Sequence, residues 1–175
     1  MKKYEFTNET RKVNGVLLHR IKRISDGLIG GWIESESNLS QEGDCFVYDN
    51  AYVYGNARVY DNAYVFGNAW VYGNAWVFGN ACVSGRAKVF GNMRVFGNAR
   101  VFCNARVYGN AWVSDNARVS GKASIGGDVL IFGKARVYKN AFVFGDAIVS
   151  GNARVSGNAW VTGDSHVTGD SRVEW

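Results

Sequence analysis

The sequence has no proline, only two histidines and only three cysteines among its 175 residues. The absence of proline, together with 22 glycines, fits regular turns between short strands. Cys45, Cys82 and Cys103 are odd in number and lack CxxC spacing, which argues against a zinc site and a disulfide framework. The histidine candidates for acid–base catalysis are limited to His19 and His166. We therefore predict no metal site and no cofactor.

The chain also lacks an apolar stretch long enough to span a membrane. Its start, Met1-Lys-Lys-Tyr-Glu-Phe, has no hydrophobic signal region, so we predict a cytoplasmic protein without membrane contact. The net charge of +5 comes from the later part of the chain, because residues 1–44 hold seven basic and seven acidic side chains. This charge permits an acidic partner without demanding one.

What the sequence has in abundance is one hexad, Val-aromatic-Gly-Asn-Ala-Xaa, repeated without insertion from Val47 to Val173. Position 1 is valine throughout, except at Ile125 and Ile131. Position 5 is nearly always alanine; its exceptions are Met93, Val129, Ser165 and Ser171. A fixed short period of this kind is the signature of a repeat architecture.

The hexad predicts a short strand followed by a tight corner. A β-branched residue at position 1 suits a strand with its side chain directed inward, and the alternation of strand side chains then directs positions 6 and 2 outward. Glycine and asparagine at positions 3 and 4 supply a corner with left-handed backbone geometry, and alanine at position 5 is small enough to lie inside it. We expect a solenoid built from these units.

The pattern resembles the hexapeptide-repeat family, which implies an all-β, left-handed parallel β-helix with three sides and about 18 residues per coil. One departure is position 2, usually aromatic, serine or threonine here, where the family often has glycine. The segment Gly-Gly-Trp-Ile-Glu-Ser-Glu-Ser-Asn-Leu-Ser, with repeated Gly-Asn-Ala-Arg-Val, is similar to the YdcK-like branch of that family. Such proteins occur in bacteria and phages and are often labelled transferases. A right-handed or two-sided solenoid is the structural alternative.

The sequence divides at residue 44. Residues 1–44 predict a capping segment, with a β-hairpin over residues 2–25 that turns at Asn14-Gly15. A parallel solenoid needs such a cap, because its terminal coil exposes an apolar stack and unpaired strand edges. We expect Ile29-Gly30 to be in phase with the hexads already. Residues 45–175 predict one continuous solenoid domain.

Steps of eighteen residues sort the outward side chains by face, because three six-residue sides return to the same face. One face carries five arginines in consecutive coils, which we call the arginine column: Arg100, Arg118, Arg136, Arg154 and Arg172. Three more basic residues, Arg86, Lys122 and Lys139, are predicted at the corner that follows this face. Guanidinium groups suit phosphates and carboxylates, so these eight residues are candidates for binding an anionic partner. The alternative is that arginine is simply a solvated, strand-tolerant residue.

Outward apolar residues gather on another face and predict an oligomer interface, since exposed patches of this size usually mark one. The candidates are Trp76, Phe96, Trp112, Leu130, Phe132 and Ile148. We expect a homo-oligomer, a dimer or a trimer, that uses this face. The alternative is that the rings pack on one another along the rod.

The sequence favours a non-enzymatic role: a rigid binding or scaffold protein that presents its faces to a protein or to another acidic partner, nucleic acid included. The rival is an acyltransferase-like enzyme acting at a subunit interface, which the family resemblance implies. His166 is the one weak catalytic candidate, because His19 falls in the predicted cap and no long loop leaves the coil to form an acyl-donor pocket.

Overall fold

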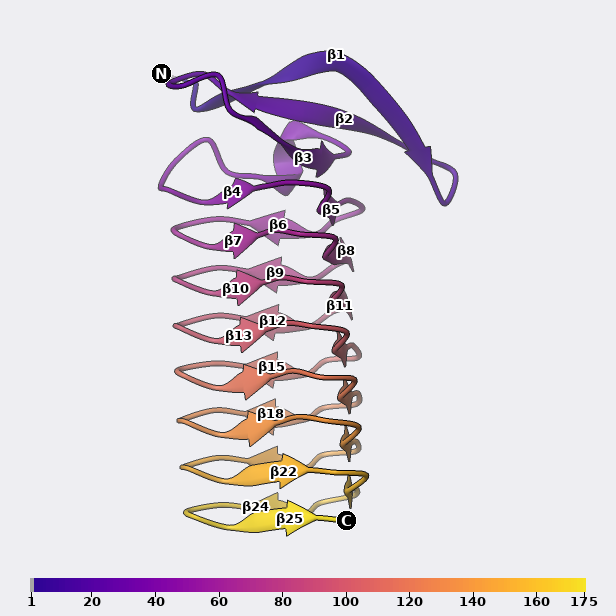
Figure 1. Ribbon diagram of the computed structural model, residues 1–175, viewed down its shortest axis with the longest axis vertical. Coiled ribbons are helices and arrows are strands. Elements are labelled where there is room, and N and C mark those ends of the chain that lie inside the picture. The colour runs from indigo at the N-terminus through magenta and orange to yellow at the C-terminus, as the bar shows by residue number, and fades with distance from the viewer. Residues whose placement is uncertain (1) are drawn as a thin grey trace.

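Short parallel strands, stacked coil upon coil, form a long rod that is closed at its N-terminal end by an antiparallel hairpin (Figure 1). This architecture comes from a computed structural model that describes residues 2–175. The strands lie in three sheets, one for each side of the coil. The three-sided parallel solenoid predicted from the hexad is therefore confirmed, and the two-sided alternative is wrong.

The first side, which we call the arginine face, is an eight-stranded sheet. Its strands are β4 (Phe46–Val47), β7 (Tyr64–Val65), β10 (Cys82–Val83), β13 (Arg100–Val101), β16 (Arg118–Val119), β19 (Arg136–Val137), β22 (Arg154–Ser156) and β25 (Arg172–Glu174). The second side, the tryptophan face, is a seven-stranded sheet. Its strands are β6 (Arg58–Val59), β9 (Trp76–Val77), β12 (Arg94–Val95), β15 (Trp112–Val113), β18 (Leu130–Ile131), β21 (Ile148–Val149) and β24 (His166–Val167).

The third side, the hairpin face, continues the N-terminal hairpin into a ten-stranded sheet. It begins with β1 (Tyr4–Val13), β2 (Val16–Arg23) and β3 (Ile29–Ile33). It continues with β5 (Tyr52–Val53), β8 (Trp70–Gly73), β11 (Lys88–Gly91), β14 (Arg106–Val107), β17 (Ser124–Ile125), β20 (Phe142–Val143) and β23 (Trp160–Val161).

Partners in neighbouring coils are eighteen residues apart, as in the pairs Arg100↔Arg118 and Arg118↔Arg136. In Figure 1 the chain crosses the front of the rod from left to right, turns backward through the hairpin face and returns behind as it descends. This path is a left-handed coil, in agreement with the sequence prediction.

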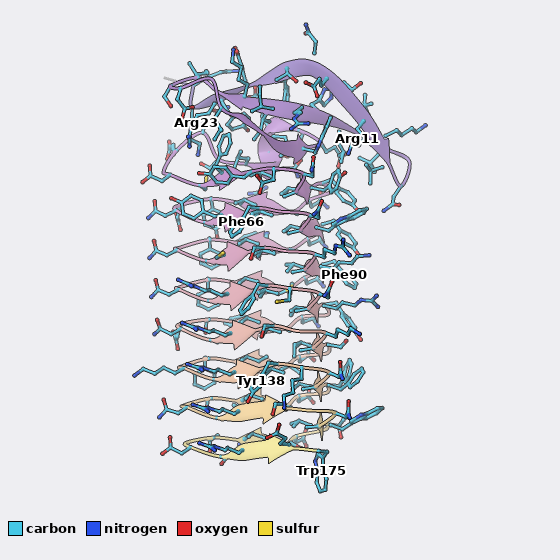
Figure 2. The ribbon with its side chains drawn as sticks, viewed as in Figure 1. Arg11, Arg23, Phe66, Phe90, Tyr138 and Trp175 are labelled. Carbon is cyan, nitrogen blue, oxygen red and sulfur yellow. The ribbon has the colours of Figure 1, made fainter. Side chains whose placement is uncertain are left out.

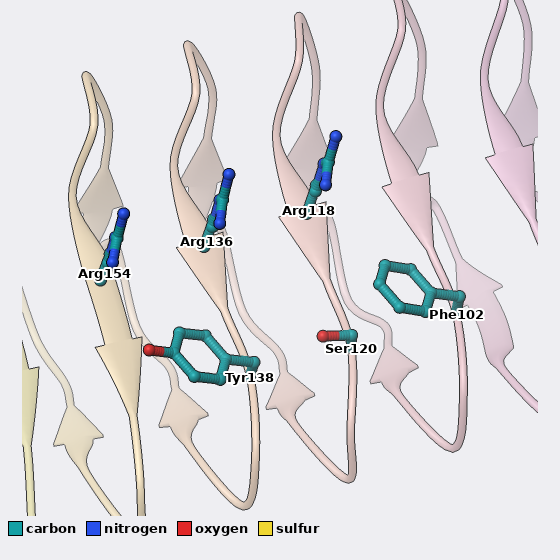
Figure 3. Close-up of a pocket in the computed structure, with 6 residues that line it drawn as sticks. All are labelled: Phe102, Arg118, Ser120, Arg136, Tyr138 and Arg154. Carbon is teal, nitrogen blue, oxygen red and sulfur yellow. The ribbon is translucent and has the colours of Figure 1, made fainter.

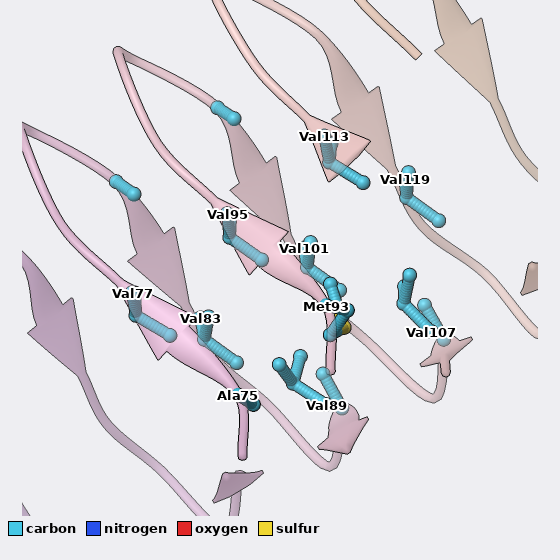
Figure 4. Packing of buried hydrophobic residues seen from close by; sticks show 14 of the residues in the cluster. Ala75, Val77, Val83, Val89, Met93, Val95, Val101, Val107, Val113 and Val119 are labelled. Atoms are coloured by element: carbon cyan, nitrogen blue, oxygen red, sulfur yellow. The ribbon is translucent and has the colours of Figure 1, made fainter. Parts of the chain in front are cut away.

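The core is a stack of valines and alanines from positions 1 and 5 (Figure 4). Position-1 side chains from Val47 to Val167 are buried, and Val173 is partly exposed in the last coil. Met93 and Val129 replace alanine at position 5 and are also fully buried. Because burial of apolar surface is the main favourable term in folding, this continuous core accounts for the uninterrupted hexad.

Glycine and asparagine have different roles at the corners of the coil. Among residues 2–175, positive φ angles within the repeats fall on position 3 and never on position 4. At Gly121, a Cβ atom would lie 2.7 Å from the backbone nitrogen of Lys139 in the next coil. This close approach between coils also favours glycine at position 121. Asparagines at position 4 instead form amide ladders, as where Asn74 Nδ2 donates to Asn92 Oδ1 at 2.8 Å.

The predicted hairpin is confirmed. β1 and β2 pair antiparallel around Asn14 and Gly15, whose φ angles of 49° and 84° fit a tight two-residue turn. Leu18 and Ile21 of β2 are fully buried. The short 3-10 helix η1 (Glu36–Asn38) follows β3, and no helix in the described chain is long and apolar enough to cross a membrane.

The predicted phase of Ile29-Gly30 is wrong. In the structure Ile33, rather than Ile29, aligns with the hexads, by pairing with Val53 of β5. Ile29 is 42% exposed. The reason is that β3 also pairs antiparallel with β2, and that hairpin packing, not the hexad, fixes its register. The assignment of residues 1–44 and 45–175 as cap and domain stays a prediction.

Candidate anion-binding face

The arginine column lies where the sequence predicts it, along one exposed edge of the arginine face. Arg100, Arg118, Arg136 and Arg154 are direct neighbours in the parallel ladder, and Arg172 extends it in the last strand. All five are exposed. No ion pair involves them within residues 2–175. From Arg100 to Arg154 the column is therefore a row of uncompensated positive charges about 5 Å apart, whereas Arg172 lies near the carboxylate of Glu174.

Position 2 of the same face alternates between rings and serines, which the sequence analysis missed. From β7 to β22 the residues are Phe66, Ser84, Phe102, Ser120, Tyr138 and Ser156. On the hairpin face, by contrast, Tyr54, Tyr72, Phe90 and Tyr108 stack without a gap. The alternation of rings and serines is present in the sequence at intervals of eighteen residues, the length of one coil.

Two neighbouring cavities occupy this face, each with a volume of about 210 Å³. The first is lined by Phe102, Arg118, Ser120, Arg136, Tyr138 and Arg154 (Figure 3). The second is lined by Phe66, Cys82, Ser84, Arg100, Phe102 and Arg118. In Figure 2 the labelled Phe66 and Tyr138, one lining residue of each cavity, lie at different heights along the rod. The four central arginines thus border hollows with apolar walls.

Cys82 belongs to the second cavity as a neutral thiol. Burial raises the pKa of Cys82 above its ordinary value, and hydrogen bonding with Ser84 opposes this only partly. A raised pKa keeps the thiol protonated near neutral pH, so it lacks the thiolate that acts as a nucleophile. The cavity therefore offers apolar walls and guanidinium groups rather than a reactive sulfur.

The basic residues at the corner differ from the column in their surroundings. The Nζ atom of Lys139 lies 2.6 Å from Glu174 Oε1, and this hydrogen bond raises the pKa of Lys139 and lowers that of Glu174. Arg86 lines a separate hollow with Trp70 and Lys88, of about 320 Å³. Lys122 is exposed. The structure thus brings four of the eight predicted residues, Arg100 to Arg154, to the two cavities.

The six predicted interface residues share the tryptophan face, and some of them already contact other side chains of the same chain. The guanidinium of Arg94 lies 5.3 Å from the ring of Trp76 and 5.0 Å from that of Trp112. Phe96 packs edge-on against Trp112. Further along, Phe132 is exposed, and Leu130 and Ile148 are half-buried neighbours in the ladder. Leu130, Phe132 and Ile148 form the apolar end of the tryptophan face.

His166 lies exposed on β24, next to Ile148 in the ladder. Within residues 2–175 no carboxylate or hydroxyl is hydrogen-bonded to its ring, so the arrangement lacks a group that would orient it as a general base. At another corner Asp128 occupies hexad position 4, and its Oδ1 accepts a hydrogen bond from Asn110 at 2.6 Å. That aspartate extends an amide ladder.

Comparison with known proteins agrees with this fold. The profile described as "YdcK Beta solenoid repeat" matches residues 57–73, 105–121, 112–127 and 153–169. The chain is also 40% identical over 63 residues to "Uncharacterized acetyltransferase YdcK" of Escherichia coli (strain K12), a match covering 28% of this chain. That match spans 19% of the relative's length, about one fifth. The chain is thus a β-solenoid repeat protein, and its repeats are YdcK-like.

Proposed function

We propose that this chain is a non-enzymatic binding protein whose arginine face holds an anionic partner. The observation that carries the proposal is the run from Arg100 to Arg154: four exposed guanidinium groups in consecutive coils, unpaired within the described residues and bordering two cavities. A solenoid holds such groups at a fixed spacing, so a partner meets a preformed row of charges.

Electrostatics favour an anion on this face. Two like charges one coil apart in water repel by about 1 kcal/mol before screening by salt. An anion laid along the column replaces this repulsion with charge-assisted hydrogen bonds, for which the planar guanidinium group is well suited. The corner residues Arg86 and Lys122 add positive charge beside the column, whereas Glu174 offsets that of Lys139.

The proposal predicts binding that depends steeply on salt. Long-chain inorganic polyphosphate is a suitable probe, because it carries charge without rings. Since each phosphate contact releases counterions, we expect the affinity of the wild-type protein to fall at least about tenfold between 50 and 200 mM salt. Isothermal titration across a salt series measures this. An affinity that stays level over that range, or no measurable binding at low salt, would contradict the proposal.

A second candidate function is acetyl transfer, which the name of the Escherichia coli relative favours. The match spans only 19% of that protein, and His166 lies on the tryptophan face, away from the cavities of the arginine face. Acetyl transfer from acetyl-coenzyme A that is lost in His166→Ala would favour the enzyme over the binding protein.

We also propose that the chain forms a homo-oligomer through the apolar end of the tryptophan face. Charged residues in place of Leu130 and Ile148 would place carboxylates in that interface, which is costly without partners. We therefore expect Leu130→Glu combined with Ile148→Glu to convert the oligomer into a monomer, as measured by light scattering. A wild-type protein that is monomeric at high micromolar concentration would refute this arrangement, and so would unchanged assembly of the double variant.

A further inference from the structure

The rings on the other faces show how much room one aromatic group takes in this solenoid. Tyr54, Tyr72 and Phe90 follow one another in consecutive coils, with ring centroids 5.2 and 4.9 Å apart and planes within 4° of parallel. On the tryptophan face, Tyr60 and Phe78 repeat this geometry at 4.9 Å and 3°. One coil therefore accommodates one tilted ring in van der Waals contact with its neighbours.

On the arginine face the same arrangement lacks a ring at Ser120. Phe102 and Tyr138 are two coils apart, about 9.6 Å along the rod, with the small side chain of Ser120 between them (Figure 3). Within residues 2–175 no ring contact joins Phe102 to Tyr138. Because one coil holds one ring elsewhere in the molecule, the gap has room for one planar group.

A comparable gap on the hairpin face is filled. At Gly126 on the hairpin face, the flanking rings of Tyr108 and Phe144 lean toward each other, to a centroid distance of 6.1 Å. A Cβ atom at Gly126 would lie 2.7 Å from the Tyr108 ring, so the rings occupy that space themselves. The gap over Ser120 instead coincides with a cavity of about 210 Å³.

The cavity over Ser120 combines ring walls with positive charge. Arg118, Arg136 and Arg154 line it together with Phe102 and Tyr138. Its volume of about 210 Å³ is below the roughly 300–1,000 Å³ typical of pockets that enclose a whole drug-sized ligand. It therefore fits a single ring system whose charged part remains outside, along the arginine column.

We propose that this cavity binds a nucleotide, with the base stacked between Phe102 and Tyr138 and the phosphates on Arg118 and Arg136. The Ser120 hydroxyl lies at the floor of the gap, where it can donate to or accept from the edge of the base. This inference rests on the proposed anion-binding function and specifies that the anionic ligand also carries a planar base.

The occupant is a free mononucleotide rather than a nucleic-acid strand, because the face has too few ring-walled gaps for a strand. Within the described residues two serine gaps lie between rings, the one over Ser120 and the second cavity over Ser84, and Glu174 stands where a further ring would follow Ser156. Ser84 and Ser156, the serines of the adjoining coil pairs, are only 8% and 2% exposed, whereas Ser120 is half-buried. A strand would need a row of open gaps for successive bases. A mononucleotide needs one.

Comparison of adenosine triphosphate with inorganic tripolyphosphate tests the proposal, since both present a triphosphate chain and only one carries a base. By isothermal titration we expect the wild-type protein to bind the nucleotide at least about fivefold more tightly, the lower end of the effect of stacking one base. Equal affinities for adenosine triphosphate and tripolyphosphate would overturn this inference. The proposed anion-binding function would still stand if the protein bound polyphosphate. The inference would also be overturned if the protein bound a single-stranded oligonucleotide but did not prefer adenosine triphosphate to tripolyphosphate.

A ring placed in the gap provides the decisive variant. Ser120→Phe should complete the ring ladder as Phe78 does between Tyr60 and Phe96, so we expect the nucleotide preference to disappear and polyphosphate binding to persist. Ser150→Phe, a serine at the same hexad position on the tryptophan face, is the matched control and should retain the preference. If Ser120→Phe does not fold, Phe102→Leu with Tyr138→Leu removes both stacking rings and should have the same effect. A preference that survives in these variants would overturn the proposal.

Discussion

Replacement of Arg118 and Arg136 by glutamate should lower the affinity for polyphosphate at least about a hundredfold. Each arginine contributes a charge-assisted hydrogen bond worth about 1.5–3 kcal/mol, and every 1.4 kcal/mol corresponds to about tenfold in affinity. The two glutamates also repel the anion at the centre of the column. Because both side chains point outward from exposed positions, the midpoint of urea denaturation should stay close to that of the wild-type protein. Titration at 50 mM salt measures the loss of affinity.

A matched control changes the same number of charges on the other two faces. Arg58→Glu with Arg106→Glu alters the tryptophan and hairpin faces and gives the same net charge. We expect this control to reduce the affinity far less, because its side chains lie outside both cavities of the arginine face. An equal loss in the control would show that the protein binds anions through its overall charge, without a specific face.

The second prediction concerns the stability of the fold. It follows from the alternation of inward and outward side chains along each strand. Val101 is fully buried between Val83 and Val119 of the neighbouring coils. Val101→Asp would leave an uncompensated carboxylate in an apolar core, a change that costs about 3–5 kcal/mol or more. Since whole domains are stable by about 5–15 kcal/mol, we expect a greatly lowered urea midpoint or failure to fold.

The adjacent residue supplies the control for this substitution. Arg100→Asp introduces the same carboxylate one position earlier, where the side chain points into solvent. We expect a change in stability within about 0.5 kcal/mol, together with weaker polyphosphate binding. Similar destabilisation by the two substitutions would contradict the assignment of hexad position 1 to the core and position 6 to the surface.

The repeat made most of the fold predictable. A period of six residues with valine at position 1 fixes which side chains enter the core, and the eighteen-residue coil places Arg118 directly beside Arg136. These features could be derived because every coil repeats the same local chemistry, so that one correct assignment of phase is correct throughout. The arginine column follows from this phase and needs no further structural information.

The cap could not be placed by the same reasoning, because its register depends on contacts outside the repeat. Gly30 and Gly31 are buried, and a Cβ atom at Gly30 would lie 2.7 Å from both Ile21 and Phe46. This close passage of β3 over the first coil brings Ile33, not Ile29, into line with Val53. The hexad phase contains no information about such a contact between the hairpin and the first coil.

The candidate site was predictable in its charges but not in its shape. The sequence places Phe102, Ser120 and Tyr138 on one face, yet it does not show whether neighbouring rings close over a small residue. They do so over Gly126, where Tyr108 and Phe144 approach to 6.1 Å, and a cavity remains over Ser120. This difference depends on ring tilt and on the surrounding side chains, which emerge only from the packed structure.

The most direct test of the central claim is a map of the arginines that contact the anion. Nuclear magnetic resonance of the guanidinium Nε–Hε groups, recorded during titration with polyphosphate, reports each arginine separately. We predict that the signals of Arg100, Arg118, Arg136 and Arg154 shift together with a common affinity, while those of Arg58 and Arg94 on the tryptophan face stay in place. Shifts spread evenly over all three faces, or confined to the tryptophan face, would contradict an anion-binding arginine face.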